Sequence, residues 1–358
     1  MSKQIRVAIP LLLVAVLLIR LFSANHYLVE KYYSNGLYPG ISKVLKYSFG
    51  WLPFSAGDML YGIAAGWLLL KVVKLIVSFI KGKYNWQLFG MAFIKTVLFL
   101  LFIYVVFNSL WGLNYNRKGI ADQLDIKMTK YSKEELVTVD SSLLQKVNES
   151  KVVLVKSKSI PKTNKEIFEQ AKGAYQNLSK EYPFCTYQPA SIKSSAWGWL
   201  GNYVGFTGYY NPFTGEAQVN TTVPRFLQPY IACHEIAHQL GYAKENEANF
   251  VGYLAATAAM DTGFYYSVYL DLFLYTQRNL FYVDSVAAKS FYKEILPEVR
   301  EDLTEWKKFN QRYTNPMEPV FSWAYGKYLK SNEQPSGVLS YDEVTGFLIA
   351  YYRKFGKL

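Results

Sequence analysis

Cysteine and histidine are both scarce in this sequence, whose 358 residues include two cysteines and three histidines. Cys185 and Cys233 are too few for a disulfide framework, and we expect two buried free thiols. The sequence has no CxxC pair, no glycine-rich phosphate loop and no G-x-S-x-G element, so it gives no sign of the chemistry that these motifs carry. No dense basic tract accompanies the net charge of +12, and we therefore expect no nucleic-acid partner.

Long hydrophobic runs, in contrast, crowd the first third of the chain. Three of them, at about residues 5–22, 59–80 and 90–111, are each long enough to cross a bilayer core of roughly 30 Å as a helix. The sequence therefore predicts a membrane domain over residues 1–112, with three transmembrane helices in contact with the lipid bilayer.

The basic residues around these runs indicate how the chain crosses the membrane. Lys3 and Arg6 precede the first run, and Lys81 and Lys83 lie in the short turn between the second and third. The positive-inside rule places both groups on the cytoplasmic side. With three spans, residues 113–358 are then expected on the opposite, extracytoplasmic face.

The composition after about residue 114 is that of a soluble domain. Ser132-x-x-Glu135 and Thr163-x-x-Glu166 are capping boxes, which predict that helices begin there. Apolar periodicity predicts further helices towards the C-terminus, at about residues 245–260, 264–282, 286–313, 318–329 and 341–355.

The middle of this domain has a different composition. The segment Ser191–Val223 is rich in Gly, Tyr, Asn and Thr, which predicts short strands and turns. A helical pattern follows from Pro224 and ends at Gly241. We therefore expect a mainly α fold, in which the transmembrane helices precede a mostly helical domain with a small β element just before its central helix.

That helix carries the motif His234-Glu235-x-x-His238. Residues four apart lie on one helical face, so both imidazoles can reach one metal ion. Neutral imidazole is a good zinc ligand, and Glu235 is placed to act as general base towards a water molecule at the metal. The flanking residues are apolar, and two histidines and a glutamate in a buried helix would be costly without a partner. We therefore expect a zinc site.

The third zinc ligand is expected to be a carboxylate, because the remaining histidine lies near the first span. Two candidates follow the motif, Glu245 and Glu247. Glu245 shares its helical face with small residues such as Gly252, which permits close approach to another helix, whereas Glu247 lies on a bulkier face with Phe250. We favour Glu245 and keep Glu247 as the alternative. Asn249, one turn after Glu245, is placed to orient a ligand from behind.

Other candidate residues have weaker sequence signals. The segment Gly205–Thr222 precedes the motif helix, and an edge strand there could bind substrate backbone by strand addition. Within it, Glu216 and Asn220 either contact substrate or cap a turn. A helper for the tetrahedral intermediate is also expected, and we name Tyr266 and Arg278 as candidates.

The motif and the following Glu245-x-x-Ala248-Asn249 together resemble the gluzincin pattern H-E-x-x-H…E-x-x-A-D/N. This pattern is found in membrane proteases of the CAAX prenyl protease and HtpX types. The resemblance implies that Glu245 is the third zinc ligand and that the domain has a zincin-like fold. The chain departs from the pattern in having Asn249 where Asp is usual and a short gap between the two motifs.

A closer resemblance covers nearly the whole chain. The three spans, the segments Trp111–Tyr115 and Asn211–Ala217, and the core His234–Gln239 are similar to an uncharacterised family of bacterial three-span membrane proteins presumed to be zinc metallopeptidases. Together with the orientation predicted from the basic residues, this resemblance leads us to expect a multi-pass protein of the bacterial inner membrane with a periplasmic domain.

The function expected from the sequence is hydrolysis of peptide bonds near the membrane by a zinc-dependent metalloendopeptidase. The substrate would be a peptide or protein. Two alternatives remain open: a zinc-dependent amidase that acts on cell-wall peptides, and a non-catalytic envelope interaction protein stabilised by zinc. An intact Glu235 favours the enzymes, because a purely structural zinc site needs no general base.

Overall fold

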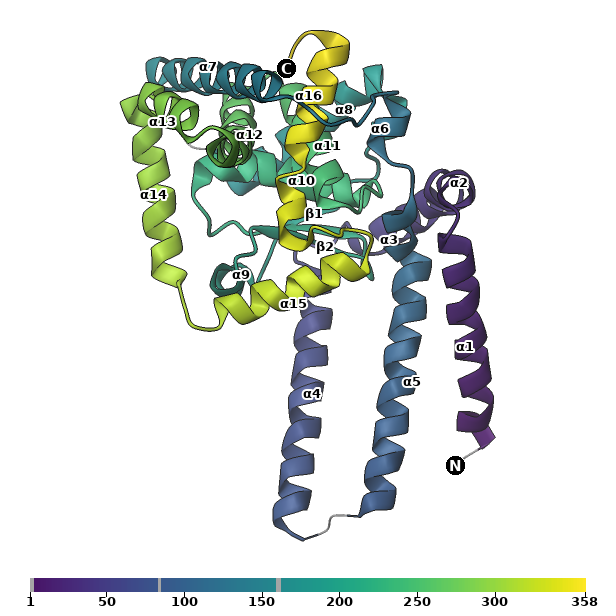
Figure 1. Cartoon of the computed structure of the whole chain (residues 1–358). Helices are drawn as coiled ribbons and strands as arrows, with labels where there is room; N and C mark the ends of the chain where they lie inside the picture. Colours follow the sequence, from purple (N-terminus) through teal and green to yellow (C-terminus); the bar gives the residue numbers. More distant parts are fainter. Residues whose placement is uncertain (1–2, 83–84, 159–161) are drawn as a thin grey trace.

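The computed structural model of the chain describes residues 3–82, 85–158 and 162–358. Lys83, one of the residues used to predict orientation, lies outside these ranges. Helices dominate the described chain, and the strands form one small sheet. The expected mainly α fold is therefore confirmed. Figure 1 shows the long helices α1, α4 and α5 projecting from one side of a larger helical domain.

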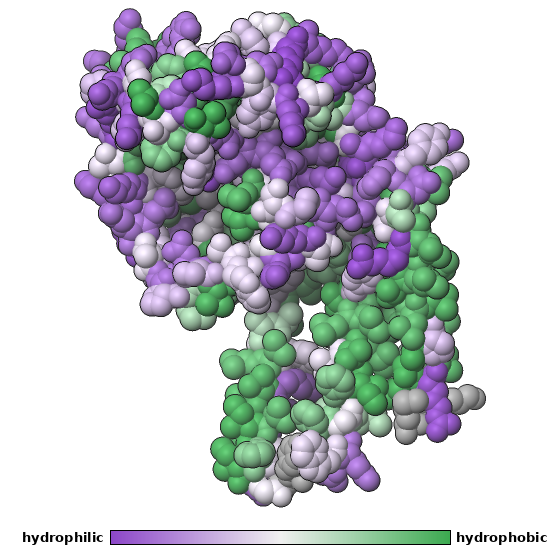
Figure 2. Space-filling view, in the orientation of Figure 1, coloured by the Kyte–Doolittle hydropathy of each residue, from purple (hydrophilic) through white to green (hydrophobic). Residues whose placement is uncertain are grey.

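The three projecting helices are α1 (Lys3–Ser23), α4 (Ala56–Ile80) and α5 (Trp86–Leu110). Each contains a segment long and apolar enough to cross a membrane, so long apolar helices are present where the three spans were predicted. Their apolar side chains point outward, and Figure 2 shows apolar surface concentrated on them and polar surface on the domain. A helix suits the bilayer because it satisfies its own backbone hydrogen bonds. The chain is a membrane protein.

The segment between the first two spans packs against the C-terminal domain. It contains α2 (His26–Leu28), a π-helix η1 (Val29–Leu37) and α3 (Tyr38–Phe49). Glu30 forms an ion pair with Arg117 at 2.7 Å, in which both side chains are buried. The Tyr38 hydroxyl donates a hydrogen bond to the carbonyl of Gln239 at 2.8 Å. Although the predicted boundary at residue 112 assigns this segment to the membrane domain, its contacts join it to the domain that follows.

Both predicted capping boxes are present. Ser132 and Glu135 cap α7, and Thr163 and Glu166 cap α8, each with the reciprocal side-chain-to-backbone bonds that define the motif. The elements from the last span to this part of the domain are η2 (Gly112–Asn116), α6 (Ile120–Gln123), α7 (Lys133–Ser157), α8 (Asn164–Glu181) and η3 (Pro183–Cys185).

The predicted helix over residues 286–313 is wrong in one respect, because it is two helices separated at Pro297. Proline favours an extended residue before it and starts a helix readily at its first position, and Leu296 has a ψ of 149°. The last predicted helix also begins later, after a 3₁₀ turn. The C-terminal elements are α12 (Thr262–Val283), α13 (Ser285–Glu294), α14 (Pro297–Tyr313), α15 (Glu318–Ser331), η5 (Gly337–Tyr341) and α16 (Val344–Phe355).

The expected small β element is a three-stranded sheet. It consists of β1 (Ile192–Ser194), β2 (Gly208–Asn211) and β3 (Glu216–Val219), in the order β1-β3-β2. β3 is parallel to β1 and antiparallel to β2, so β2 is an edge strand. The short helix α9 (Gly198–Val204) lies between β1 and β2 in the chain.

The core of the domain is built around α10 (Gln228–Gln239), which follows the 3₁₀ turn η4 (Arg225–Leu227). Every residue of α10 is buried, and the helix packs against α8, α11 (Glu245–Thr257), α12 and the sheet. Cys185 and Cys233 are free and buried, as expected. The fold therefore places the motif helix at the centre of the domain.

Candidate metal centre

The end of α10 determines where the motif meets the next helix. Gly241 adopts a φ of +87°, a left-handed conformation that glycine takes without steric cost at a helix end. A Cβ at this position would also lie 3.0 Å from the Tyr38 ring and 3.1 Å from Asn114 Oδ1. The chain reverses there, so that α11 starts at Glu245 and packs directly against α10.

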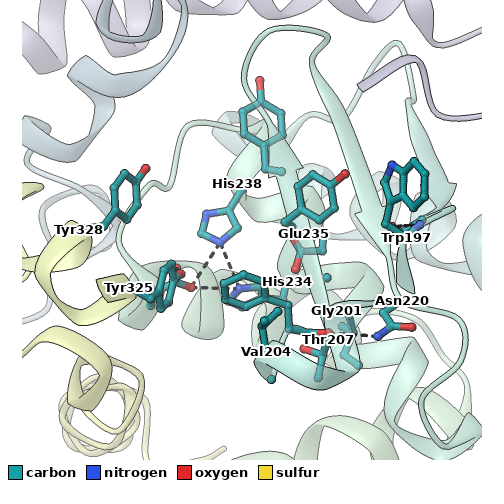
Figure 3. Close-up of a pocket in the computed structure, with 18 of the residues that line it drawn as sticks. Trp197, Gly201, Val204, Thr207, Asn220, His234, Glu235, His238, Tyr325 and Tyr328 are labelled. Carbon is teal, nitrogen blue, oxygen red and sulfur yellow. Dashed lines mark hydrogen bonds and ion pairs between the residues drawn. The ribbon is translucent and has the colours of Figure 1, made fainter. Parts of the chain in front are cut away.

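Three ligand atoms converge at this junction. The Nε2 atoms of His234 and His238 are 3.1 Å apart, and they lie 3.3 Å and 3.4 Å respectively from Glu245 Oε2. All three residues are buried. Of the His, Cys, Asp and Glu side chains in the described part of the chain, these three lie close enough together to hold one metal ion. Figure 3 shows the two imidazoles turned towards each other. The buried His-His-Glu group could bind a metal ion.

Glu245 reaches this position because the two helices approach closely. A Cβ at Gly252 would lie 3.1 Å from the backbone nitrogen of His234 and 3.2 Å from its Cα. Any larger residue there would push α11 away from α10. The small face predicted around Glu245 is therefore the face that packs against the motif helix.

Glu247, the alternative ligand, lies on a different side of α11. Its carboxylate approaches Gly119 so closely that a side chain there would collide with it. Burial raises the pKa of Glu247 to about 7, against the opposing charges of Lys244 and Arg117. The structure thus does not bring Glu247 to the two histidines.

The two histidines are oriented by contacts on the side of the ring that faces away from the cluster. His238 Nδ1 lies 2.8 Å from the carbonyl of Tyr242, which turns Nε2 towards the site. Asn249 is a hydrogen-bonding neighbour of His234 and is itself held by Tyr230, whose hydroxyl lies 3.3 Å from Asn249 Oδ1. Asn249 therefore lies where the sequence predicted a residue that orients a ligand.

The charges within the cluster shift its pKa values in different directions. Burial lowers the pKa of His234. Burial also opposes the charged form of His238, but the Glu245 carboxylate outweighs it and raises the pKa of His238 to about 8. The imidazoles hold the pKa of Glu245 far below its usual range despite burial. A carboxylate that stays ionised beside two imidazoles is suited to bind a cation.

Glu235 lies next to the cluster but outside it. Burial raises the pKa of its carboxyl group to about 8. Its Oε2 atom is buried and has no hydrogen-bond partner among the described residues. Gly208 faces it on β2, where a Cβ would lie 2.5 Å from Glu235 Oε1. The carboxylate is therefore free for a partner in the adjoining cavity.

That cavity has a volume of about 1200 Å³ and contains the cluster in its wall. Figure 3 shows His234, Glu235 and His238 along one part of it, with Tyr325 and Tyr328 on another. Asn220 also lines the cavity, whereas Glu216 does not. A molecule larger than water could therefore lie against the cluster.

Glu216 and Asn220 both make internal contacts. Glu216 is fully buried, pairs with Lys193 at 2.7 Å and accepts the backbone N–H groups of Ala56 and Gly57, the first residues of α4. It caps the second span. The Asn220 amide donates to the carbonyls of Gly198 and Phe206, so its polar group holds the loop around α9.

Neither suggested helper for a tetrahedral intermediate lies in the wall of the cavity. The hydroxyl of Tyr266 is hydrogen-bonded to Asp302, and Arg278 pairs with Asp342 at 3.1 Å. Both side chains have structural partners away from the cluster.

The structure adds a residue that the sequence did not single out. The Tyr325 hydroxyl, on α15, donates a hydrogen bond to Glu245 Oε1 at 2.8 Å and lies 3.2 Å from the Tyr341 hydroxyl. The chain has 31 tyrosines, and no local pattern distinguishes this one. Only the tertiary packing of α15 brings it to the cluster.

Trp111 links the centre to the membrane. It follows the last residue of α5, and its indole N–H donates to the carbonyl of His238 at 3.0 Å. The third span is therefore hydrogen-bonded directly to the turn that carries the second histidine.

Comparison of the chain with known proteins and protein families identifies one matching family. No curated protein and no solved structure matches the chain significantly. A family model described as "Protein of unknown function (DUF3810)" matches residues 33–349, a range that contains two of the spans, the sheet and the whole His-His-Glu cluster. Because the match covers most of the chain, this membrane protein belongs to the DUF3810 family.

Proposed function

We propose that the protein is a membrane-anchored zinc metallopeptidase. In this proposal His234, His238 and Glu245 hold the zinc, and Glu235 is the general base. The observation that supports it best is the convergence of three buried ligand atoms within 3.1–3.4 Å of one another, beside an unpartnered carboxylate in the wall of a cavity.

The donor set fits zinc. Glu245 Oε2 is buried without a hydrogen-bond donor among the described residues, although it faces two imidazole nitrogens. Two imidazoles and one carboxylate are a common ligand set of catalytic zinc, which keeps a further position open. Zinc bound there would polarise a substrate carbonyl and lower the pKa of a water molecule.

The residues of the chain supply the remaining chemistry. Glu235 would take the proton from the attacking water and pass it to the leaving amine. Tyr325 would hold Glu245 in place through its hydrogen bond. The cluster is buried against protein on most sides, so the charges of these groups act more strongly than they would in solution.

The open edge of β2 suggests how a peptide would lie. The carbonyl of Thr207 accepts the N–H of Asn220 on the β3 side, so the alternation of an antiparallel pair turns the backbone groups of Gly208 and Tyr210 to the other side. Both residues line the cavity. An extended peptide paired with this edge would carry its backbone past Glu235.

We place the domain on the extracytoplasmic side of the bacterial inner membrane. The start of α1, the end of α4 and the start of α5 lie at the end of the spans away from the domain, as Figure 1 shows. The basic residues Lys3, Arg6 and Lys81 lie at that end in sequence, which supports this orientation.

The substitution Glu235→Gln tests the proposal. Zinc-loaded full-length protein in lipid nanodiscs would be incubated with a mixed peptide library, and the products identified by mass spectrometry. We expect the wild type to hydrolyse peptides and the rate to fall by about a thousandfold or more in Glu235→Gln, because the general base is removed. The zinc content should stay unchanged.

The matched control is Glu247→Gln, which alters another buried carboxyl group of the domain and should remain active. Full activity of Glu235→Gln, or no hydrolysis of any peptide by the wild type, would contradict the proposal.

A further inference from the structure

The cavity beside the metal centre extends down the membrane spans. Besides the cluster, its wall includes Tyr61 of α4 and Leu100, Ile103, Tyr104 and Phe107 of α5. Leu100 lies about 15 Å from the end of α5 at Leu110, at roughly 1.5 Å per residue. This is about half the thickness of a bilayer core of roughly 30 Å.

An aromatic contact between the two spans lies at a matching depth. Trp67 of α4 and Phe99 of α5 are in contact, with ring centroids 6.0 Å apart. Trp67 lies about 16 Å from the start of α4 at Ala56 by the same helical rise. The side chains of the two spans therefore meet near the middle of the membrane, whereas the cavity residues Tyr61 and Ile103 lie nearer to the domain along their helices.

The cavity is also open at the level of the bilayer. Leu100 is part of its wall and is nevertheless 60% exposed. The short helix α9 and helix α15 contribute exposed apolar residues to the same wall, Leu200 and Phe321 among them. Figure 1 shows α9 and α15 on the face of the domain from which the spans emerge. Apolar and aromatic residues at such a position suit the membrane interface.

The two ends of the cavity differ in chemistry. The end in the domain carries the metal ligands and Glu235, whereas the end between the spans is formed by apolar and aromatic side chains. A wholly polar peptide would gain nothing from the second end, where it would lose its hydration. An occupant that fills both ends must carry a peptide bond at one end and a hydrocarbon-rich chain at the other.

We infer that the substrates are peptides tethered to an apolar membrane anchor, and that the anchor enters sideways from the bilayer between α4 and α5. This inference rests on the proposed function. The peptide next to the anchor then reaches β2, Glu235 and the metal ligands without leaving the membrane surface.

The lining of the apolar end determines the chemistry of the anchor. Leu100, Ile103 and Phe107 offer hydrocarbon and an aromatic ring, so the part of the anchor that lies against them is apolar. A lipid acyl chain and an apolar stretch of polypeptide share this chemistry.

The first test compares anchors on one short peptide. The peptide is used free, with a palmitoyl chain, and with an apolar spanning helix, each with full-length zinc-loaded protein in nanodiscs. We expect an anchored form to be cleaved with a kcat/KM at least about tenfold above that of the free peptide, since burial of even a few methylene groups is worth that much. A preference for the palmitoyl form identifies an acyl chain, and a preference for the helix-linked form identifies an apolar polypeptide anchor. Equal rates for all three would overturn the inference while leaving the peptidase intact.

A second test uses substitutions and does not depend on turnover alone. Ile103→Trp fills the apolar end and should raise KM for the anchored peptide without affecting the free one. Phe102→Trp is the control, because Phe102 is 52% exposed on the same helix and is not part of the cavity wall. In Glu235→Gln protein, a photoreactive residue at position 103 should crosslink the anchored peptide, and one at position 102 should not. Equal crosslinking at both positions would overturn the inference even if no peptide were hydrolysed.

Discussion

The side chains of the candidate metal centre are oriented by hydrogen bonds to the atoms that face away from the cluster. His238 is oriented by the carbonyl of Tyr242, and Glu245 by the hydroxyl of Tyr325. Partners of this kind fix ring and carboxylate orientation before the metal binds. Tyr325 reaches Glu245 from α15, far along the chain, so the affinity of the site depends on the docking of that helix.

The substitution Tyr325→Phe removes this hydrogen bond and keeps the ring. We expect the zinc affinity to fall by about 10–100-fold, which is usual for loss of a residue that orients a ligand. The affinity would be measured by competition with a chelator. Tyr328→Phe is the matched control, since Tyr328 lies on the same helix but is hydrogen-bonded to Tyr115. Equal affinities of the two variants would show that Tyr325 does not orient Glu245.

At the scale of the elements, α7 and α12 pack along each other and enclose an unusual carboxyl group. Asp140 of α7 is fully buried and accepts a hydrogen bond from the Thr276 hydroxyl of α12, while its Oδ2 atom has no partner among the described residues. Burial raises the pKa of Asp140 to about 7. The folded protein therefore holds a proton there that the unfolded chain loses at much lower pH.

This shift predicts a pH-dependent stability. Between about pH 4 and pH 7 the folded state binds more protons than the unfolded state, so the free energy of unfolding falls as the pH rises through this range. Asp140→Asn should remove the part of the fall that Asp140 causes and stabilise the protein at pH 8 by about 1–3 kcal/mol, with little effect at pH 4. Thermal unfolding at both pH values checks this, with the exposed Asp122→Asn as control. A destabilised Asp140→Asn protein at pH 8 would contradict the prediction.

Local patterns predicted the elements that local physics determines. The spans follow from apolar length, and α7 and α8 begin at capping boxes whose bonds lie within four residues. The approach of Glu245 to the two histidines also follows from a local feature, the small face of α11 around Gly252. The break at Pro297 had a visible signal, but apolar periodicity on both sides of it favoured a continuous helix.

The features that could not be predicted from the sequence depend on contacts between residues far apart in the chain. The π-helix η1 and α3 have no capping or periodic signal strong enough to predict their place beneath the domain, which depends on the Glu30–Arg117 ion pair and on Tyr38. Tyr325 likewise acts only through tertiary contact. The capping of α4 by Glu216, a residue far along the chain, could not be read from spacing either.

For the whole molecule, the spans and the domain form one connected unit. Trp111 joins α5 to the motif helix, Glu216 caps α4, and the cavity passes between the domain and both spans. The candidate metal centre is therefore held at a fixed position relative to the spans. The orientation of the same three spans determines on which side of the membrane the domain lies.

The proposed orientation predicts the labelling of single cysteines. Lys127→Cys in the domain should react with a membrane-impermeant maleimide added to intact spheroplasts, and Lys81→Cys in the α4–α5 turn should react only after lysis. Both positions are exposed, and Cys185 and Cys233 are buried and should contribute little background. Labelling in the opposite order would place the domain in the cytoplasm.

The most direct test of the account is the metal content of the purified protein. Wild type, His238→Ala, Glu245→Gln and Glu247→Gln would be prepared in mild detergent, supplied with zinc, desalted and analysed by mass spectrometry of the metal. We expect near-stoichiometric zinc in the wild type and in Glu247→Gln, and its loss in His238→Ala and Glu245→Gln, because only these two lack an atom of the converging cluster. A wild type without tightly bound zinc, or a loss in Glu247→Gln and not in Glu245→Gln, would contradict the proposed centre.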